Sequence, residues 1–251
     1  MATTVEVLSE AFDEMGTPFI VGHPGGETVE LMDAARNRQV RFILMKQETA
    51  GAMMAATWGE ITGSPGVSVS TRGPGAANMV NGVAHAWMDR APLIVINDQY
   101  PGATYETGMR QVLNQHALFA PITKWQSTIH AKSVRQQIRR AIRVTTTPTP
   151  GPVQFDMPSN ETMGEAVEAA GEAPLLPNVV PMEPDRNALR VPLQALSNAS
   201  KPILLAGLGV FWDEASAELV KLAERLGAPV LTTSKCKGAI PEDHPLRAGC
   251  V

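Results

Sequence analysis

The chain has 251 residues, 44% of them hydrophobic and 18% charged, so it can form the core of one large domain or two smaller ones. Its formal net charge of −4 provides no basic surface of the kind that binds nucleic acid. Two cysteines are too few for a disulfide framework or a zinc site, and they favour the reducing cytoplasm as the location. We expect no membrane segment and no secretory signal, because no apolar run has the required length or position.

Apolar runs and helical patterns alternate along the first part of the chain. We predict helices over 5–15, 27–36, 48–61, from 75 onward and over 134–144, and strands over 19–21, 42–45, 66–71, 93–96 and 153–156. Strands that alternate with helical crossovers form a parallel sheet with helices on both faces, so the predicted fold class is α/β.

The composition changes after this part. Residues 169–184 are rich in Pro, Glu, Gly and Ala, which is typical of a linker between domains. A second pattern follows, with helices over 187–198 and 215–226 and strands over 202–206 and 229–233. We therefore predict a first domain over 1–168, a linker over 169–184 and the first part of a Rossmann-like α/β domain over 185–251.

Glu48 is the most informative single residue. It stands between the apolar run 42–45 and a helix made almost wholly of small residues, where a side chain would lie between sheet and helix. A buried carboxyl group at such a position is a candidate proton donor or acceptor. The structural alternative is that Glu48 only favours the helix N-terminus through the helix dipole.

Five sequence blocks surround this glutamate. They are VGHPGGE at 21–27, MKQETAGAMMAA at 45–56, VSVSTRGPGAAN at 67–78, APLIVIND at 91–98 and GPVQFDMP at 151–158. In this order and spacing they resemble the N-terminal, pyrimidine-binding domain of thiamine-diphosphate enzymes of the acetolactate synthase, glyoxylate carboligase and benzoylformate decarboxylase group. The resemblance runs from Val5 to Pro158. It continues at 201–209 and 237–246 into the first half of the family's middle domain.

The resemblance implies a set of site residues. Glu48 would bind N1′ of the cofactor's aminopyrimidine and activate it for formation of the C2 ylid. Pro24, Gly25, Pro74 and Asn78 would complete the cofactor-binding set. For the substrate, the resemblance and the neighbouring sequence indicate His23, Gln111 and His116. Arg110-Gln111-Val112 keeps only the glutamine of the family's Phe-Gln-Glu motif, and Gln115 or His116 could serve in place of Gln111.

The family's magnesium ligands lie in a sequence motif that this chain lacks. The family holds magnesium and the diphosphate through a Gly-Asp-Gly motif in a third domain, and this chain has no such sequence. We therefore expect no metal ligands in this chain. It could be a fragment of a longer enzyme, a split subunit or a degenerate paralogue.

The function implied by the resemblance is that of a 2-oxo-acid decarboxylase or carboligase. Two alternatives stay open: a non-catalytic or regulatory paralogue that acts through protein interactions, and an acyltransferase of the same family. Acetolactate synthases hold a non-redox FAD in the middle domain, but Gly207-Leu208-Gly209 is only part of a dinucleotide-binding pattern. We also expect a homo-oligomer, a dimer or a tetramer, with the small residues of the helices at Ala52 and Ala77 in the interface.

Overall fold

The computed structural model describes residues 2–167, 176 and 184–251. The chain divides into two compact units, Met1–Asn178 and Val179–Val251. The linker predicted over 169–184 lies almost entirely outside the described residues.

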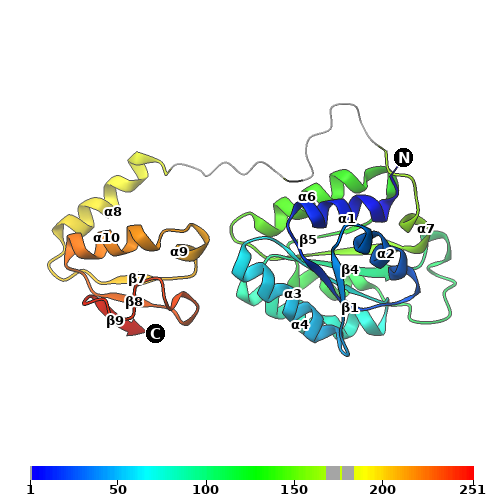
Figure 1. The fold of residues 1–251 in the computed structure, drawn as a ribbon, viewed down its shortest axis with the longest axis horizontal. Coiled ribbons are helices and arrows are strands. Elements are labelled where there is room, and N and C mark those ends of the chain that lie inside the picture. Colours follow the sequence, from blue (N-terminus) through cyan, green and yellow to red (C-terminus); the bar gives the residue numbers. More distant parts are fainter. Residues whose placement is uncertain (1, 168–175, 177–183) are drawn as a thin grey trace. The chain divides into compact units, whose positions relative to one another are not determined.

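A six-stranded parallel sheet forms the centre of the first unit (Figure 1), with the strand order β2-β1-β3-β4-β6-β5. The strands are β1 (Phe19–His23), β2 (Arg41–Leu44), β3 (Gly66–Ser70), β4 (Leu93–Gln99), β5 (Trp125–Thr128) and β6 (Pro152–Pro158). The three central strands β3, β4 and β6 are buried along their whole length. A parallel sheet covered on both sides buries its central strands in this way.

Helices cover both faces of this sheet, which confirms the predicted fold class. On one face lie α1 (Thr4–Glu14), α2 (Val29–Asn37) and α6 (Val134–Thr146), and on the other lie α3 (Glu48–Thr62), α4 (Pro74–Asp89) and α5 (Gln115–Phe119). Leu8, Phe12 and Ile138 belong to the core on the first face. Ala52, Met79 and Phe119 belong to the core on the second face.

The predicted helices and strands of the first unit are present, with ends that differ by a few residues. The predicted helix over 27–36 is divided into a 3-10 turn (Gly26–Thr28) and α2. The sequence patterns did not predict β5, α5 or the short helix α7 (Ser159–Thr162). The edge strand β5 is only half-buried and has four residues, so it lacks the apolar run of a central strand.

The small residues of α3 and α4 bring these two helices close together. A Cβ atom on Gly82 would lie only 2.6 Å from the Cβ atom of Ala52 and 2.6 Å from the carbonyl oxygen of Thr49. Ala52 is fully buried by this contact within one chain. The small residue Ala52 therefore serves the packing of α3 on α4, and an interface on these helices stays a prediction. Ala77 is exposed.

The second unit has a three-stranded parallel sheet in the order β7-β8-β9. Its strands are β7 (Leu204–Ala206), β8 (Val230–Thr232) and β9 (Arg247–Cys250), and its helices are α8 (Arg186–Asn198), α9 (Gly209–Trp212) and α10 (Ser216–Leu226). Ala206, Ala223, Val230 and Ile240 are among the buried residues of its core. No described helix of either unit has both the length and the apolar composition needed to cross a membrane.

Candidate functional site

The candidate residues gather at one edge of the first sheet because all six strands are parallel. The loops after β1, β2 and β3 therefore emerge side by side at the carboxyl ends of the strands. The chain goes from β1 outward to β2 and then returns across β1 to β3. Open α/β sheets bind ligands at such reversals of strand order, outside the carboxyl ends of the strands.

Glu48 is the first residue of α3, and only 7% of its surface is exposed. Its Oε2 atom accepts a hydrogen bond from Asn78 Nδ2 at 3.2 Å. The Thr49 hydroxyl donates to the carbonyl oxygen of Asn78. These two bonds join the N-terminal parts of α3 and α4, so the carboxylate is held in one orientation at the edge of the sheet.

Two glycines lie against this carboxylate and its surroundings. A Cβ atom on Gly75 would lie 3.3 Å from Glu48 Oε1 and 2.7 Å from the methyl group of Thr71. A Cβ atom on Gly25 would lie 2.7 Å from the hydroxyl oxygen of Thr71. Thr71 therefore lies between the loop after β1 and the start of α4. Because Thr71 contacts both glycines, one cluster contains Gly25, Gly75, Glu48 and Asn78.

The remaining predicted residues of this region lie around the cluster. Pro24 adjoins Gly25 and is half-buried, and Pro74 is the exposed first residue of α4. His23 is exposed, and its Nδ1 atom lies 2.9 Å from the carbonyl oxygen of Met45, to which it donates. Gln111 is exposed, but its backbone lies against the turn before α4, because a Cβ atom on Gly73 would come within 2.4 Å of the Gln111 carbonyl oxygen.

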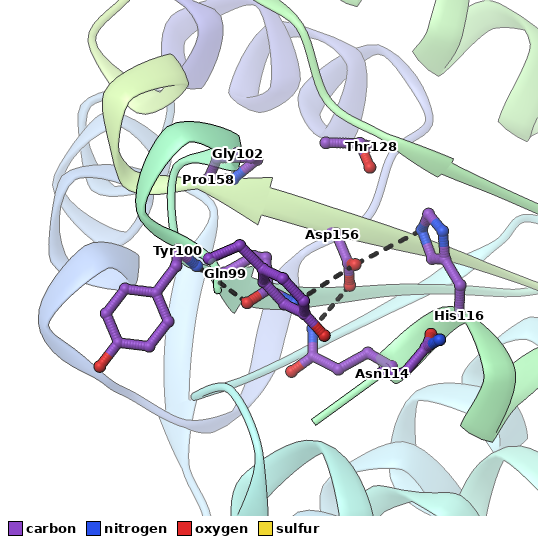
Figure 2. Close-up of a pocket in the computed structure, with 10 residues that line it drawn as sticks. Gln99, Tyr100, Gly102, Asn114, His116, Thr128, Asp156 and Pro158 are labelled. Carbon is purple, nitrogen blue, oxygen red and sulfur yellow. Dashed lines mark hydrogen bonds and ion pairs between the residues drawn. The ribbon is translucent and has the colours of Figure 1, made fainter. Parts of the chain in front are cut away.

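His116 lies in a different place, a pocket of about 270 Å³ at the carboxyl ends of β4, β5 and β6 (Figure 2). Its Nε2 atom is 3.5 Å from Asp156 Oδ2, and the side-chain amides of Gln99 and Gln115 also point to Asp156. Glu48 does not line this pocket. The structure thus brings Pro24, Gly25, Glu48, Pro74 and Asn78 to one region and separates His116 from them.

A row of buried polar side chains crosses the sheet from the first region to this pocket. Asn97 donates to Ser70 Oγ at 2.8 Å, and Gln154 donates to Asn97 Oδ1 at 3.1 Å and to Asp156 Oδ1 at 2.8 Å. Burial of polar groups is costly unless they are hydrogen-bonded. This row therefore fixes the relative positions of β3, β4 and β6 at the edge that carries the candidate residues.

Sequence reasoning assigned no role to Asp98 and gave Gln115 only as a substitute for Gln111. Both are buried, and both contact the turn that leads into α4. Asp98 Oδ1 accepts from the backbone N–H of Arg72 at 2.7 Å, and Gln115 Oε1 accepts from the backbone N–H of Gly73 at 3.0 Å. The available signal for Asp98 was its position two residues after the buried run 93–96, where a carboxylate is unusual.

The described residues contain no group of three or more His, Cys, Asp or Glu side chains that could hold a metal ion. Arg72 and Asp98 form an ion pair in the first region. Arg72 Nε lies 3.7 Å from Asp98 Oδ1, and the Arg72 guanidinium lies over the Tyr100 ring at 4.0 Å from its centroid.

Comparison with known proteins gives this geometry a context. Residues 2–118 match the family model of the thiamine pyrophosphate enzyme N-terminal TPP binding domain, and residues 190–251 match the model of the central domain. The chain is 35% identical over 253 residues to a probable acetolactate synthase large subunit of Methanocaldococcus jannaschii, with 98% of this chain and 42% of that protein covered. It is 29% identical over 250 residues to an acetolactate synthase of Mycobacterium bovis, with 98% and 40% covered.

A solved structure of a thiamine diphosphate-dependent enzyme has a similar fold. The thiamine diphosphate-dependent 4-hydroxybenzoylformate decarboxylase of Rhodococcus jostii RHA1 is 27% identical and superposes with a TM-score of 0.85, covering 99% of this chain and 48% of that one. The chain spans less than half the length of each of these three proteins. Both of its α/β units match the same family in the same order, and we conclude that the chain belongs to the thiamine pyrophosphate enzymes, of which it carries the N-terminal domain and central-domain sequence.

Proposed function

We propose that this chain supplies the pyrimidine-binding part of a thiamine-diphosphate-dependent enzyme that decarboxylates a 2-oxo acid or joins the product to an acceptor, as acetolactate synthases do. One observation carries the proposal. Glu48 is a buried carboxylate at the start of α3, and Asn78 holds it at 3.2 Å within a domain that matches the family's TPP-binding model.

The residues present fit the aminopyrimidine of the cofactor. The Asn78 amide donates a hydrogen bond to Glu48 Oε2. The other carboxylate oxygen, Oε1, lies next to Gly75, which has no side chain to cover it. A ring nitrogen that carries or shares a proton is the group such an oxygen can bind. Pro24 and Gly25, in the loop after β1, would lie beside the ring, as the resemblance to the family implies.

Thiamine diphosphate, when bound, supplies an acidic thiazolium carbon and an electron sink for the loss of carbon dioxide. Glu48 would hold a proton at N1′ of the aminopyrimidine. Asn78 would keep the carboxylate turned toward that atom. The low exposure of Glu48 strengthens such a proton-sharing hydrogen bond, because the local dielectric constant is low.

The proposal extends to magnesium, oligomeric state and location. Magnesium would bind the diphosphate through the Gly-Asp-Gly motif of the family's third domain in the complete enzyme. A homo-oligomer would bring another copy of the enzyme to the Glu48 edge. The free thiols of Cys236 and Cys250 favour a reducing, cytoplasmic location. FAD is not part of the proposal, because the loop at Gly207 leads into the four-residue helix α9 and not into the long helix of a dinucleotide-binding unit.

Exchange of the C2 proton of the cofactor tests the proposal. In the complete enzyme that contains this chain, Glu48→Gln should slow hydrogen–deuterium exchange at C2 by several orders of magnitude, because the amide cannot hold the proton at N1′. Glu14→Gln changes an exposed carboxylate at the end of α1 and serves as the matched control. An unchanged exchange rate in Glu48→Gln would remove Glu48 from the reaction and end the proposal.

A further inference from the structure

We propose that Asp98 is a positioning residue that holds two separate loops of the cofactor site in register. This inference rests on the proposed function, because it concerns the same site. It assigns a role to a side chain that is not among the predicted cofactor-binding residues. The loops are residues 23–26, which begin at the last residue of β1, and residues 71–75, which run from the end of β3 into the first turn of α4. They carry Pro24, Gly25 and Pro74.

The position of Asp98 follows from the strand register. Ser70, the last residue of β3, lies opposite Asn97 in β4. The residues that follow them, Thr71 and Asp98, therefore lie side by side at the carboxyl edge of the sheet. Asp98 is completely buried. A buried carboxylate requires hydrogen bonds or a counter-charge to remain stable.

Asp98 obtains its partners from the 71–75 loop. The backbone N–H of Arg72 donates to Oδ1 at 2.7 Å, and the Thr71 hydroxyl donates to Oδ2 at 3.4 Å. The Arg72 side chain supplies the counter-charge, with Nε at 3.7 Å from Oδ1. Hydrogen bonds to a carboxylate are stronger than those between neutral groups, so this carboxylate fixes the path of the turn that begins α4.

The same carboxylate also limits the 23–26 loop. A Cβ atom on Gly25 would lie only 2.7 Å from Asp98 Oδ2, closer than real Cβ atoms come to any heavy atom. The backbone of Gly25 therefore packs directly on the carboxylate. A local hydrogen bond also stabilises this loop: the Thr28 hydroxyl oxygen accepts from the Gly25 N–H at 2.9 Å. Asp98 is thus the shared support of both loops.

Gln115 provides a second support for the 71–75 loop only. Its side chain accepts from the Gly73 N–H at 3.0 Å, and it donates to the Asp98 carbonyl oxygen at 3.2 Å and to Asp156 Oδ1 at 2.6 Å. Figure 2 shows Asp156 as the meeting point of several side chains at the neighbouring pocket. Because Gln115 contacts one loop and Asp98 contacts two, variants of these residues should have different effects.

Amide hydrogen exchange in the complete enzyme, first without added cofactor, tests this difference. In Asp98→Asn and Asp98→Ala, we expect faster exchange in the segments 23–28 and 71–75 together. In Gln115→Met we expect faster exchange in 71–75 alone. The asparagine variant keeps the shape of the side chain, so it remains informative if the alanine variant fails to fold. Glu161→Gln is the matched control, because Glu161 also accepts a backbone N–H, that of Ala131 at 2.7 Å, at a different loop.

Cofactor titration is the second readout. Asp98→Asn should raise the thiamine diphosphate concentration for half-maximal activity about tenfold or more, the effect expected from loss of a hydrogen bond to a charged group, while kcat at saturating cofactor changes less. Glu161→Gln should leave both values unchanged. A rise in exchange over the whole first unit, or wild-type exchange and affinity in both Asp98 variants, would overturn the proposal.

The two proposals fail in different ways. If the wild-type enzyme does not bind thiamine diphosphate, the proposed function fails, and the exchange of the two segments still decides whether Asp98 holds them. If Glu48→Gln stops C2 exchange but the Asp98 variants behave as wild type, the function stands and the positioning role is wrong.

Discussion

Asn78 Nδ2 and Glu48 Oε2 come from two different helices and meet at 3.2 Å at the edge of the sheet. Replacement of Asn78 by alanine removes the donor and frees the carboxylate to rotate. We expect Asn78→Ala to lower the rate of C2 proton exchange about ten- to a hundredfold, since a hydrogen bond to a charged group contributes roughly 1.5–3 kcal/mol. Exchange measured by NMR at saturating cofactor checks this value.

Asn81→Ala is the control for this prediction. Asn81 lies on α4 as Asn78 does, and its side chain is exposed. The control should exchange at the wild-type rate. Equal rates in the two variants would show that Asn78 does not orient Glu48.

The close approach of α3 and α4 leads to a prediction about stability. Gly82→Ala places a Cβ atom 2.6 Å from Ala52 Cβ and from the Thr49 carbonyl oxygen, so one helix must move. We expect a loss of about 1–3 kcal/mol in the free energy of unfolding, as for other overpacked cores. Urea unfolding measures it. Gly102→Ala is the control, because a Cβ atom there meets nothing within 4 Å, and a similar loss in both variants would contradict the packing argument.

Most of the fold could be predicted because the central strands are short apolar runs separated by helical patterns. The grouping of Gly25, Glu48 and Asn78 was expected from the resemblance to the family, and parallel strands whose loops share one edge give it a physical reason. The edge strand β5 and the five-residue helix α5 are too short and too polar to give a periodic signal.

The support of the site could not be predicted from sequence patterns. Asp98 and Gln115 act through contacts with Arg72 and Gly73, which are distant in sequence. The spacing of residues shows which side chains reach the edge of the sheet. It does not show which of them meet, so His116 was grouped with Gln111 although it pairs with Asp156.

The N-terminus of α1 gives a prediction about pH. The backbone N–H of Thr3 donates to Glu6 Oε2 at 2.7 Å and its hydroxyl donates at 3.1 Å, and these bonds lower the pKa of Glu6 from its usual value. A lowered folded-state pKa means that Glu6 stabilises the fold above its unfolded pKa, and that this contribution is lost as the pH falls through the folded value.

Three variants test the contribution of this helix cap and its pH dependence. Thr3→Ala should lower the free energy of unfolding by about 1 kcal/mol at pH 7, as loss of a helix cap usually does. Thr3→Ser keeps the hydroxyl and should behave nearly as wild type. Glu6→Gln should be less stable than wild type at pH 7, and the difference should shrink toward pH 3. Urea unfolding across this range gives the values, and a difference that does not depend on pH would contradict the role of the Glu6 charge.

The exposed apolar side chains of α3 and α4 lead to a prediction about association. Ile61 and Met88 are 79% and 78% exposed, and Met54 and Trp87 are also exposed on these two helices. Exposed apolar groups on adjacent helices are typical of protein interfaces. If this surface joins two copies of the enzyme, Met88→Glu should raise the dissociation constant of the oligomer at least tenfold, because a charge would enter an apolar contact. Val29→Glu, at an exposed apolar side chain of α2 on the other face of the sheet, should have no effect. Light scattering over a range of concentrations measures the association, and a monomeric wild-type enzyme at high concentration would exclude this interface.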